Sequence, residues 1–129
     1  MKLIQKAVIR NGDKYLIGLR APAAKYFPQH WDFFGGTLEP GEDPKAGIAR
    51  EVKEETDLDV KPGKVLGVYE FDLDNLGTSS HRFTIYAAEI ISGQLKLNPE
   101  HLQFIWASKE DIMKLPVEPY FKPFFHDNP

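Results

Sequence analysis

Three glutamates with the spacing of a metal site lie in one predicted helix. The Asp43-Pro44 pair is typical of an N-cap followed by proline at the first helical position, which predicts a helix over residues 44–56. At ~100° per residue, Glu51, Glu54 and Glu55 share one helix face. Like charges at this spacing destabilise a helix by roughly 0.2–0.5 kcal/mol per pair, whereas carboxylates bind Mg²⁺ together with water and substrate phosphates. The pattern therefore indicates phosphate chemistry through a bound divalent cation.

The same acidic run is also compatible with an ordinary solvated helix face. Lys45 and Lys53 point elsewhere on the helix wheel and do not neutralise the three carboxylates. A buried side is predicted about 115° from the acids, and it consists of Ile48, Ala49, Val52 and Thr56. The acids should therefore lie at the border of the core. They would face a loop at Gly35-Gly36, where glycine lets a ligand approach the backbone closely.

The segment from Gly36 to Leu58 resembles the signature of the Nudix hydrolase family. That signature is Gly, five residues, Glu, seven residues, Arg-Glu, an aliphatic residue, any residue, Glu-Glu, any residue, Gly, and an aliphatic residue. Asp57 replaces its second glycine, for which we expect a small cost in stability at a left-handed helix end, and Phe34 stands where many relatives have proline. The matching residues are Gly36, Glu42, Arg50, Glu51, Val52, Glu54, Glu55 and Leu58.

The resemblance implies a fold and a set of roles for these residues. The fold is the Nudix fold of the α/β class, a mixed β-sheet sandwiched between α-helices, over essentially the whole chain. Glu54 and Glu55 would be the leading ligands of Mg²⁺ or Mn²⁺, with the Gly36 carbonyl as an addition. Glu51 would be a further ligand or the base that activates water. Arg50 would orient a neighbouring carboxylate, although a plain surface pair with Glu54 is the alternative.

Two further acids have open roles. Glu42 would either support the helix start or act in the outer shell of the metal site. In this family another acid often comes from a loop before the tryptophan of the last strand, and Glu100 precedes Trp106 in that way. Glu100 is thus predicted as a metal ligand, with a solvated loop glutamate as the alternative. His81 and His101 are not expected to take part in the chemistry.

Substrate-binding residues are predicted around the loop from Ala21 to His30 and at the start of the signature. Loops on a rigid scaffold often carry recognition. Tyr26 and Phe27 could instead cover the core. The predicted set is Arg20, Tyr26, His30, Phe33 and Gly35, with Lys25 and Phe27 also within reach of a nucleotide.

Composition bounds the remaining possibilities. A length of 129 residues with 42% hydrophobic content predicts one domain over residues 1–129. There is no cysteine, which excludes disulfides and thiolate chemistry and disfavours a Nudix-like isopentenyl diphosphate isomerase. No apolar run approaches ~18 residues and the start lacks a signal-peptide pattern, so a cytoplasmic protein without membrane contact is expected. The net charge of −3 argues against nucleic-acid binding and for a small substrate. The resemblance implies that this substrate is a small-molecule nucleotide, and the protein is expected to be a monomer or homodimer.

The remaining elements follow from alternation and turn signals. Turns are expected at residues 11–13, 61–63 and 92–93, and residues 34–43 are expected to form a loop. The tail at residues 116–129 is rich in proline and aromatic residues, and its aromatic stretch, residues 119–125, should pack against its own sheet, a second subunit or the substrate base. Strands are predicted at residues 3–10, 14–20, 31–33, 64–72, 81–91, 95–97 and 104–107, and a short helix capped by Ser108 at residues 109–115.

Substrate choice within the family stays open at this stage. The lead-in WDFFGG resembles relatives that cleave a (deoxy)nucleoside triphosphate to a monophosphate and pyrophosphate. The alternatives are ADP-ribose, another nucleotide sugar or a dinucleoside polyphosphate, but the proline and tyrosine markers of such relatives are absent from residues 73–76. Val117 stands where oxidised-purine-cleaving relatives can place asparagine. A non-catalytic nucleotide-sensing domain is a further alternative, although all the helix acids are present.

Overall fold

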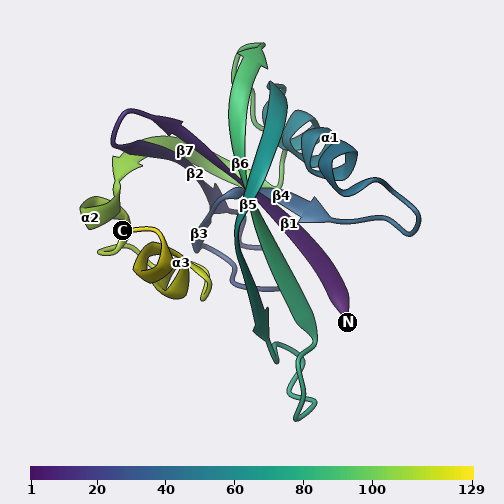
Figure 1. Ribbon diagram of the computed structural model, residues 1–129. Helices are drawn as coiled ribbons and strands as arrows, with labels where there is room; N and C mark the ends of the chain where they lie inside the picture. Colours follow the sequence, from purple (N-terminus) through teal and green to yellow (C-terminus); the bar gives the residue numbers. More distant parts are fainter.

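The sheet is organised around its first strand, β1 (Figure 1). The computed structural model describes residues 1–129 and shows a seven-stranded mixed sheet in the order β3-β2-β1-β6-β5. β1 pairs in parallel with β6 and antiparallel with β4, and its last residues pair with β2, whose other partners are β3 and β7. The strands are β1 (Lys2–Asn11), β2 (Lys14–Arg20), β3 (Trp31–Asp32), β4 (Phe34–Thr37), β5 (Asp59–Phe71), β6 (His81–Ser92) and β7 (His101–Ser108).

Helices lie on both sides of this sheet, as Figure 1 shows. They are α1 (Pro44–Thr56), α2 (Lys109–Ile112) and α3 (Phe121–Asp127). None of them has both the length and the apolar character needed to cross a membrane. The predicted mixed sheet between helices is confirmed.

Local sequence determines both ends of α1. The Asp43 side chain accepts a hydrogen bond from the Ala46 N–H (3.0 Å), and Pro44 follows it as predicted. Asp57 ends the helix in the left-handed conformation (φ 61°), and its N–H donates to the Lys53 carbonyl. Aspartate therefore fulfils the C-terminal role that glycine has in the family signature.

Alternating residues of the strands supply two separate cores, because successive side chains of a strand point to opposite faces. On one face Ile48 and Val52 of α1 pack against Leu16 of β2 and Phe34 of β4. The opposite face is aromatic, and it includes Tyr15, Phe33, Phe83, Tyr120, Phe121, Phe124 and Phe125. Phe33 thus belongs to the aromatic core, whereas its neighbour Phe34 belongs to the core under α1. The chain changes from one core to the other between β3 and β4.

Several predicted boundaries are wrong. Residues 34–37 form strand β4 instead of a loop, since the glycines bring this backbone against β1. Residues 95–97 are not a strand; this loop is held through the Lys96 N–H, which donates to the Thr56 carbonyl (2.9 Å). The expected turn at 61–63 is absorbed into β5 as irregular pairing with β6. α2 is only four residues long, and α3 was not predicted.

The aromatic tail packs into the protein's own core, which confirms one of its three predicted roles. Tyr120, Phe121, Phe124 and Phe125 are all buried. The Tyr120 hydroxyl also accepts a hydrogen bond from the Phe33 N–H (3.0 Å), so this residue satisfies the backbone where the chain crosses from β3 to β4. The tail therefore stabilises the strand connection that leads to the glycine pair.

We expect Phe124→Ala to destabilise the protein by about 3–5 kcal/mol, because it removes a buried ring from the aromatic core. Urea unfolding followed by circular dichroism measures this change. Lys122→Ala, at an exposed position of the same helix, is the matched control and should change stability by less than about 0.5 kcal/mol. Equal effects of the two substitutions would contradict the packing role of the tail.

Candidate active site

A cavity of about 830 Å³ lies between α1, the first half of β1 and the loop that follows β2. Charged side chains, the backbone of the glycine pair and several apolar side chains line it. Ten of its lining residues were predicted to act in the chemistry or to reach a nucleotide: Arg20, Lys25, Tyr26, Gly35, Gly36, Arg50, Glu51, Glu54, Glu55 and Glu100. The cavity is also lined by residues without such a prediction, among them Lys2, Lys6, His81 and Glu118.

The three helix glutamates differ in exposure. The Glu54 side chain is 55% exposed, that of Glu51 14% and that of Glu55 only 4%. The prediction that the acids lie at the border of the core is therefore correct for Glu51. Glu55 lies inside it, where its Oε1 accepts a hydrogen bond from the Gly35 N–H (2.7 Å).

Arg50 lies among the carboxylates and contacts three of them. Its guanidinium binds Glu42 through two hydrogen bonds (2.7 and 3.0 Å). Its Nη1 lies 3.0 Å from Glu51 Oε1 and 3.1 Å from Glu54 Oε1. Arg50 was expected to orient a neighbouring carboxylate or to pair with Glu54, and its guanidinium contacts Glu54 together with Glu42 and Glu51. Glu42 anchors this arginine, and the same hydrogen bonds lower the pKa of Glu42 to about 2.

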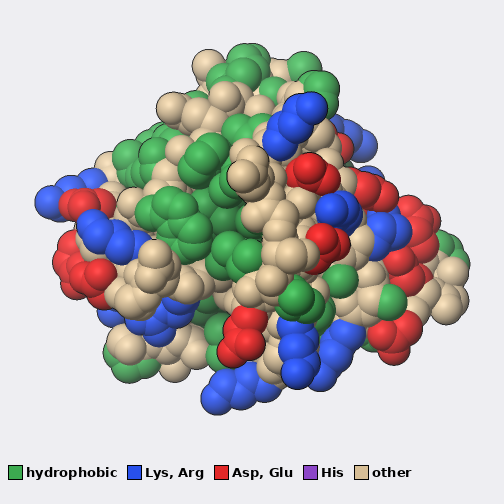
Figure 2. Space-filling view, turned by 90° about the horizontal axis from the view of Figure 1, so that it is seen from above, with side chains coloured by type: hydrophobic (Ala, Val, Ile, Leu, Met, Phe, Trp, Pro, Cys, Tyr) green, Lys and Arg blue, Asp and Glu red, His purple; other side chains and the backbone are tan.

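Lys53 of α1 forms its ion pairs with residues outside the acidic cluster. Lys53 forms ion pairs with Asp57 (3.3 Å) and Asp59 (3.4 Å), away from the cavity. Charges of both signs consequently intermingle along one side of the molecule, beside an area of hydrophobic side chains (Figure 2).

The glycine pair brings the β4 backbone against the acids. A Cβ atom on Gly36 would collide with the Glu51 carboxylate, and one on Gly35 would collide with the Gln5 carbonyl of β1. At both positions glycine therefore allows the close approach that the sequence predicts, and the atoms that approach it belong to the protein. It places the Gly36 backbone directly beside Glu51.

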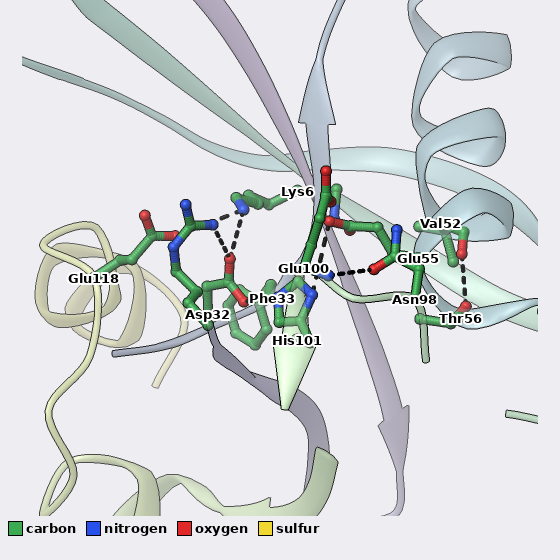
Figure 3. Close-up of polar contacts among 12 residues, drawn as sticks. Lys6, Asp32, Phe33, Val52, Glu55, Thr56, Asn98, Glu100, His101 and Glu118 are labelled. Carbon is green, nitrogen blue, oxygen red and sulfur yellow. Dashed lines mark hydrogen bonds and ion pairs between the residues drawn. The ribbon is translucent and has the colours of Figure 1, made fainter. Parts of the chain in front are cut away.

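A buried network of charged side chains underlies the cavity (Figure 3). Asp32 Oδ2 accepts hydrogen bonds from Lys6 Nζ (2.9 Å) and Arg20 Nη1 (3.0 Å), and Asp32 Oδ1 lies 2.8 Å from His101 Nε2. Burial by itself would raise the pKa of Asp32, but the charge of Lys6 and the contact with His101 outweigh it and lower that pKa. Asp32 is thus held ionised.

Sequence reasoning missed most of this network. Lys6, Asp32 and Glu118 received no role, and His101 was expected to be uninvolved. A charged Lys6 within the apolar alternation of the first strand was the available signal, because a lysine is rarely buried without a partner. Its partners Asp32 and Glu118 are far from it in sequence, so the pairing could not be read from the chain.

Four buried side-chain atoms have no hydrogen-bond partner, and two belong to cavity residues. These two are Glu118 Oε1, which lies 3.6 Å from Lys6 Nζ, and His81 Nε2. Buried polar atoms are usually hydrogen-bonded. Both residues therefore bring a polar atom without a hydrogen-bond partner to the wall of the cavity.

The predicted nucleotide-binding residues separate into two groups. Arg20 and Tyr26 line the cavity, where the Tyr26 ring packs against His81 and its hydroxyl donates to Asp74. Phe33 and His30 do not. Phe33 is fully buried among the aromatic side chains of the tail, so its predicted contact with substrate was wrong, and the His30 ring lies against Phe27 outside the cavity.

The acidic wall has the donor chemistry of a divalent-cation site. Burial raises the pKa of Glu51 and raises that of Glu55 further, and neighbouring carboxylates, including Glu100, add to both shifts. No group of three acids or histidines is spaced to enclose a metal ion in this structure, since Arg50 Nη1 lies between Glu51 and Glu54. The residues fit a hard cation because positive charge would relieve the unfavourable ionisation of Glu51 and Glu55. Glu51, Glu54, Glu55, Glu100 and the Gly36 carbonyl could hold it.

We expect Glu55→Gln to raise the melting temperature in the presence of a chelator. The unfolded chain releases the Glu55 proton near its ordinary pKa of 4.5, whereas burial raises the pKa of Glu55 in the folded protein. Wild-type stability should consequently fall as pH rises above that value, and glutamine removes this loss.

The advantage of the variant should be absent near pH ~4 and reach roughly 3–5 °C near neutrality. Thermal unfolding at a series of pH values measures it, and Glu89→Gln at an exposed position of β6 is the control. A variant less stable than wild type at every pH would refute the assignment of Glu55 as a strained buried acid.

Comparisons with known proteins agree with this geometry. Residues 5–127 match the family model described as the NUDIX domain. The CTP pyrophosphohydrolase of Escherichia coli (strain K12) is 27% identical over 121 residues, which cover 92% of this chain and 86% of that protein. The uncharacterized Nudix hydrolase YvcI of Bacillus subtilis (strain 168) is 28% identical over 122 residues, covering 92% and 73%.

A solved structure, that of the MutT protein from Methanosarcina mazei Go1, superposes with a TM-score of 0.81 at 29% identity and covers 97% of this chain and 90% of its own. The family model spans nearly the whole chain, and five of the signature residues, Gly36, Arg50, Glu51, Glu54 and Glu55, line one cavity. The chain therefore belongs to the Nudix family of hydrolases.

Proposed function

We propose that this Nudix hydrolase cleaves a (deoxy)nucleoside triphosphate to a nucleoside monophosphate and pyrophosphate, with Mg²⁺ or Mn²⁺ as cofactor. The family acts on nucleoside diphosphate-linked substrates, and its members generally need a divalent cation. The observation that carries the proposal is the grouping of Glu51, Glu54, Glu55 and Glu100 on one wall of a cavity large enough for a nucleotide.

The opposite side of the cavity offers positive charge. Lys2 and Lys25 extend beside the Tyr26 ring, at 5.9 and 5.2 Å from its centroid, and Arg20 lies deeper in the cavity. Basic side chains that line the same cavity as the acids can bind the phosphate oxygens that point away from the cation. This division of charge supports a substrate with several phosphates.

The base of the nucleotide would lie towards Lys6 and Glu118. Glu118 Oε1 lacks a partner and Lys6 Nζ lies beside it, so the two present an acceptor and a donor next to each other. Ile4 and Phe83 line the cavity as well and supply an apolar surface. A purine or pyrimidine edge, which carries adjacent donors and acceptors, matches this arrangement.

Hydrolysis requires neutralisation of the phosphate oxygens and removal of a proton from the attacking water. A divalent cation supplies positive charge to the phosphate oxygens in the transition state. Glu51 would accept the proton from water, because burial raises its pKa and it lies at the cavity beside Gly36. Arg50 would hold Glu51 and Glu54 in place through its anchor on Glu42.

Glu54→Gln is expected to lower turnover by about 100-fold or more while the fold stays intact, since the side chain is exposed and not part of the core. Steady-state hydrolysis at saturating Mg²⁺ and a thermal melt measure the two properties. Glu89→Gln, an exposed glutamate far along β6, should leave both unchanged. A variant with turnover within a few-fold of wild type would disprove a role for Glu54 in cation binding.

The products decide the reaction type. With nucleoside triphosphates, sugar nucleotides and dinucleoside polyphosphates as a panel, we expect the fastest hydrolysis from a triphosphate, with monophosphate and pyrophosphate separated by chromatography. CTP belongs in the panel because the E. coli relative is named a CTP pyrophosphohydrolase. Reaction in ¹⁸O-water identifies the attacked phosphorus. Orthophosphate and a diphosphate as main products would rule out the proposed cleavage, and binding without hydrolysis would favour a sensing domain.

A further inference from the structure

His101 is enclosed between two carboxylates, and neither the family signature nor the proposed reaction includes it. The ring is fully buried, with Nε2 at 2.8 Å from Asp32 Oδ1 and Nδ1 at 3.8 Å from Glu55 Oε2 (Figure 3). His101 is the first residue of β7, and the two acids belong to β3 and α1. One side chain thus connects three elements that are distant in sequence.

The orientation of this ring is fixed. Asp32 accepts hydrogen bonds from Lys6 and Arg20 through its other oxygen, so its carboxylate has little freedom to turn. The Phe34 ring lies 4.8 Å from the imidazole between centroids, and a Cβ on Gly18 would come within 2.7 Å of His101 Cδ2. With Nε2 directed at Asp32, Nδ1 must face Glu55.

Glu55 is hydrogen-bonded on one side and lies 3.8 Å from His101 Nδ1 on the other, which is too far for a hydrogen bond. Its Oε1 accepts the Gly35 N–H at 2.7 Å, and its Oε2 faces His101 Nδ1. His101 Nδ1 has no hydrogen-bond partner and is inaccessible to solvent. A buried polar atom without a hydrogen bond lowers the stability of the folded protein, and an apolar ring that only filled space would not have this penalty. Its position beside a carboxylate indicates a polar role.

We propose that His101 is a positioning residue that orients the Glu55 carboxylate for cation binding, by transmitting the fixed position of Asp32 across the imidazole. The inference rests on the proposed function, since it assigns Glu55 to the cation. Residues that orient metal ligands typically change metal affinity by 10–100-fold when they are replaced. An effect of that size is expected here.

The test is Mn²⁺ binding to the full chain, measured by the electron paramagnetic resonance signal of free Mn²⁺ and therefore independent of turnover. His101→Gln is the main variant, because its amide can still donate to Asp32 and so keeps that buried acid paired, while nothing replaces Nδ1. We expect Mn²⁺ affinity to fall by about 10-fold with a folded protein by circular dichroism. His126→Gln, at an exposed histidine of α3 outside the cavity, is the matched control and should bind as wild type does.

A double-mutant cycle separates positioning from a general structural effect. If His101 acts through Glu55, His101→Gln should weaken Mn²⁺ binding in the wild-type background and have little further effect in the Glu55→Gln background. Equal losses in both backgrounds would overturn the inference, and so would unchanged affinity of the single variant. Asp32→Asn provides a second route should His101→Gln fail to fold, since it loosens the imidazole from the other side and should show the same dependence on Glu55.

The outcomes also distinguish this inference from the proposed function. Wild-type protein that binds no Mn²⁺ in the presence or absence of a nucleotide would overturn both. Wild-type protein that binds Mn²⁺ and hydrolyses nucleotide, with His101→Gln identical to it, would overturn only the positioning role.

Discussion

The buried charge of Asp32 is the constraint on which the rest of the site depends. An isolated carboxylate in a protein interior is unfavourable by several kcal/mol, and it is tolerated only when donors surround it. Asp32 has three, from Lys6 on β1, Arg20 at the end of β2 and His101 on β7. Because each donor comes from a different strand, satisfying this one side chain fixes the relative positions of those strands beneath the cavity.

The glycine pair that follows Asp32 transfers this order to α1. Phe33 and Phe34 enter opposite cores, and the backbone then runs along β1 without room for a side chain at Gly35. The Gly35 N–H donates to Glu55, and the Gly36 backbone lies against Glu51. Two acids of the helix are therefore located by backbone atoms of a strand, which is a stiffer support than contacts between side chains.

Charge in the cavity is balanced only in part. Arg50 contacts three glutamates, and Lys6 faces Glu118 and Asp32, yet burial still raises the pKa of Glu51, Glu55 and Glu118. Such residual strain is common where a protein is built to receive a charged group. It is consistent with a site that reaches its stable electrostatic state only with a cation and a phosphate-bearing substrate bound, as we propose.

Local signals in the sequence determined the limits of α1, the grouping of its acids and the family resemblance, because caps, helical spacing and a 23-residue motif all act within one segment. They failed for β4, which pairs with β1, and for α3, which is buried in the aromatic core. They also failed for residues 95–97, where the Lys96 N–H donates to the Thr56 carbonyl and no strand pairing forms. The network of Lys6, Asp32, His101 and Glu118 was decided by tertiary structure alone, since its members are up to 112 positions apart (118 − 6) and become partners only when the sheet forms. A charged side chain needs a buried partner only after folding has removed it from water, and the sequence does not show which charges become buried. For this reason the acids could be predicted, but the groups that hold them could not.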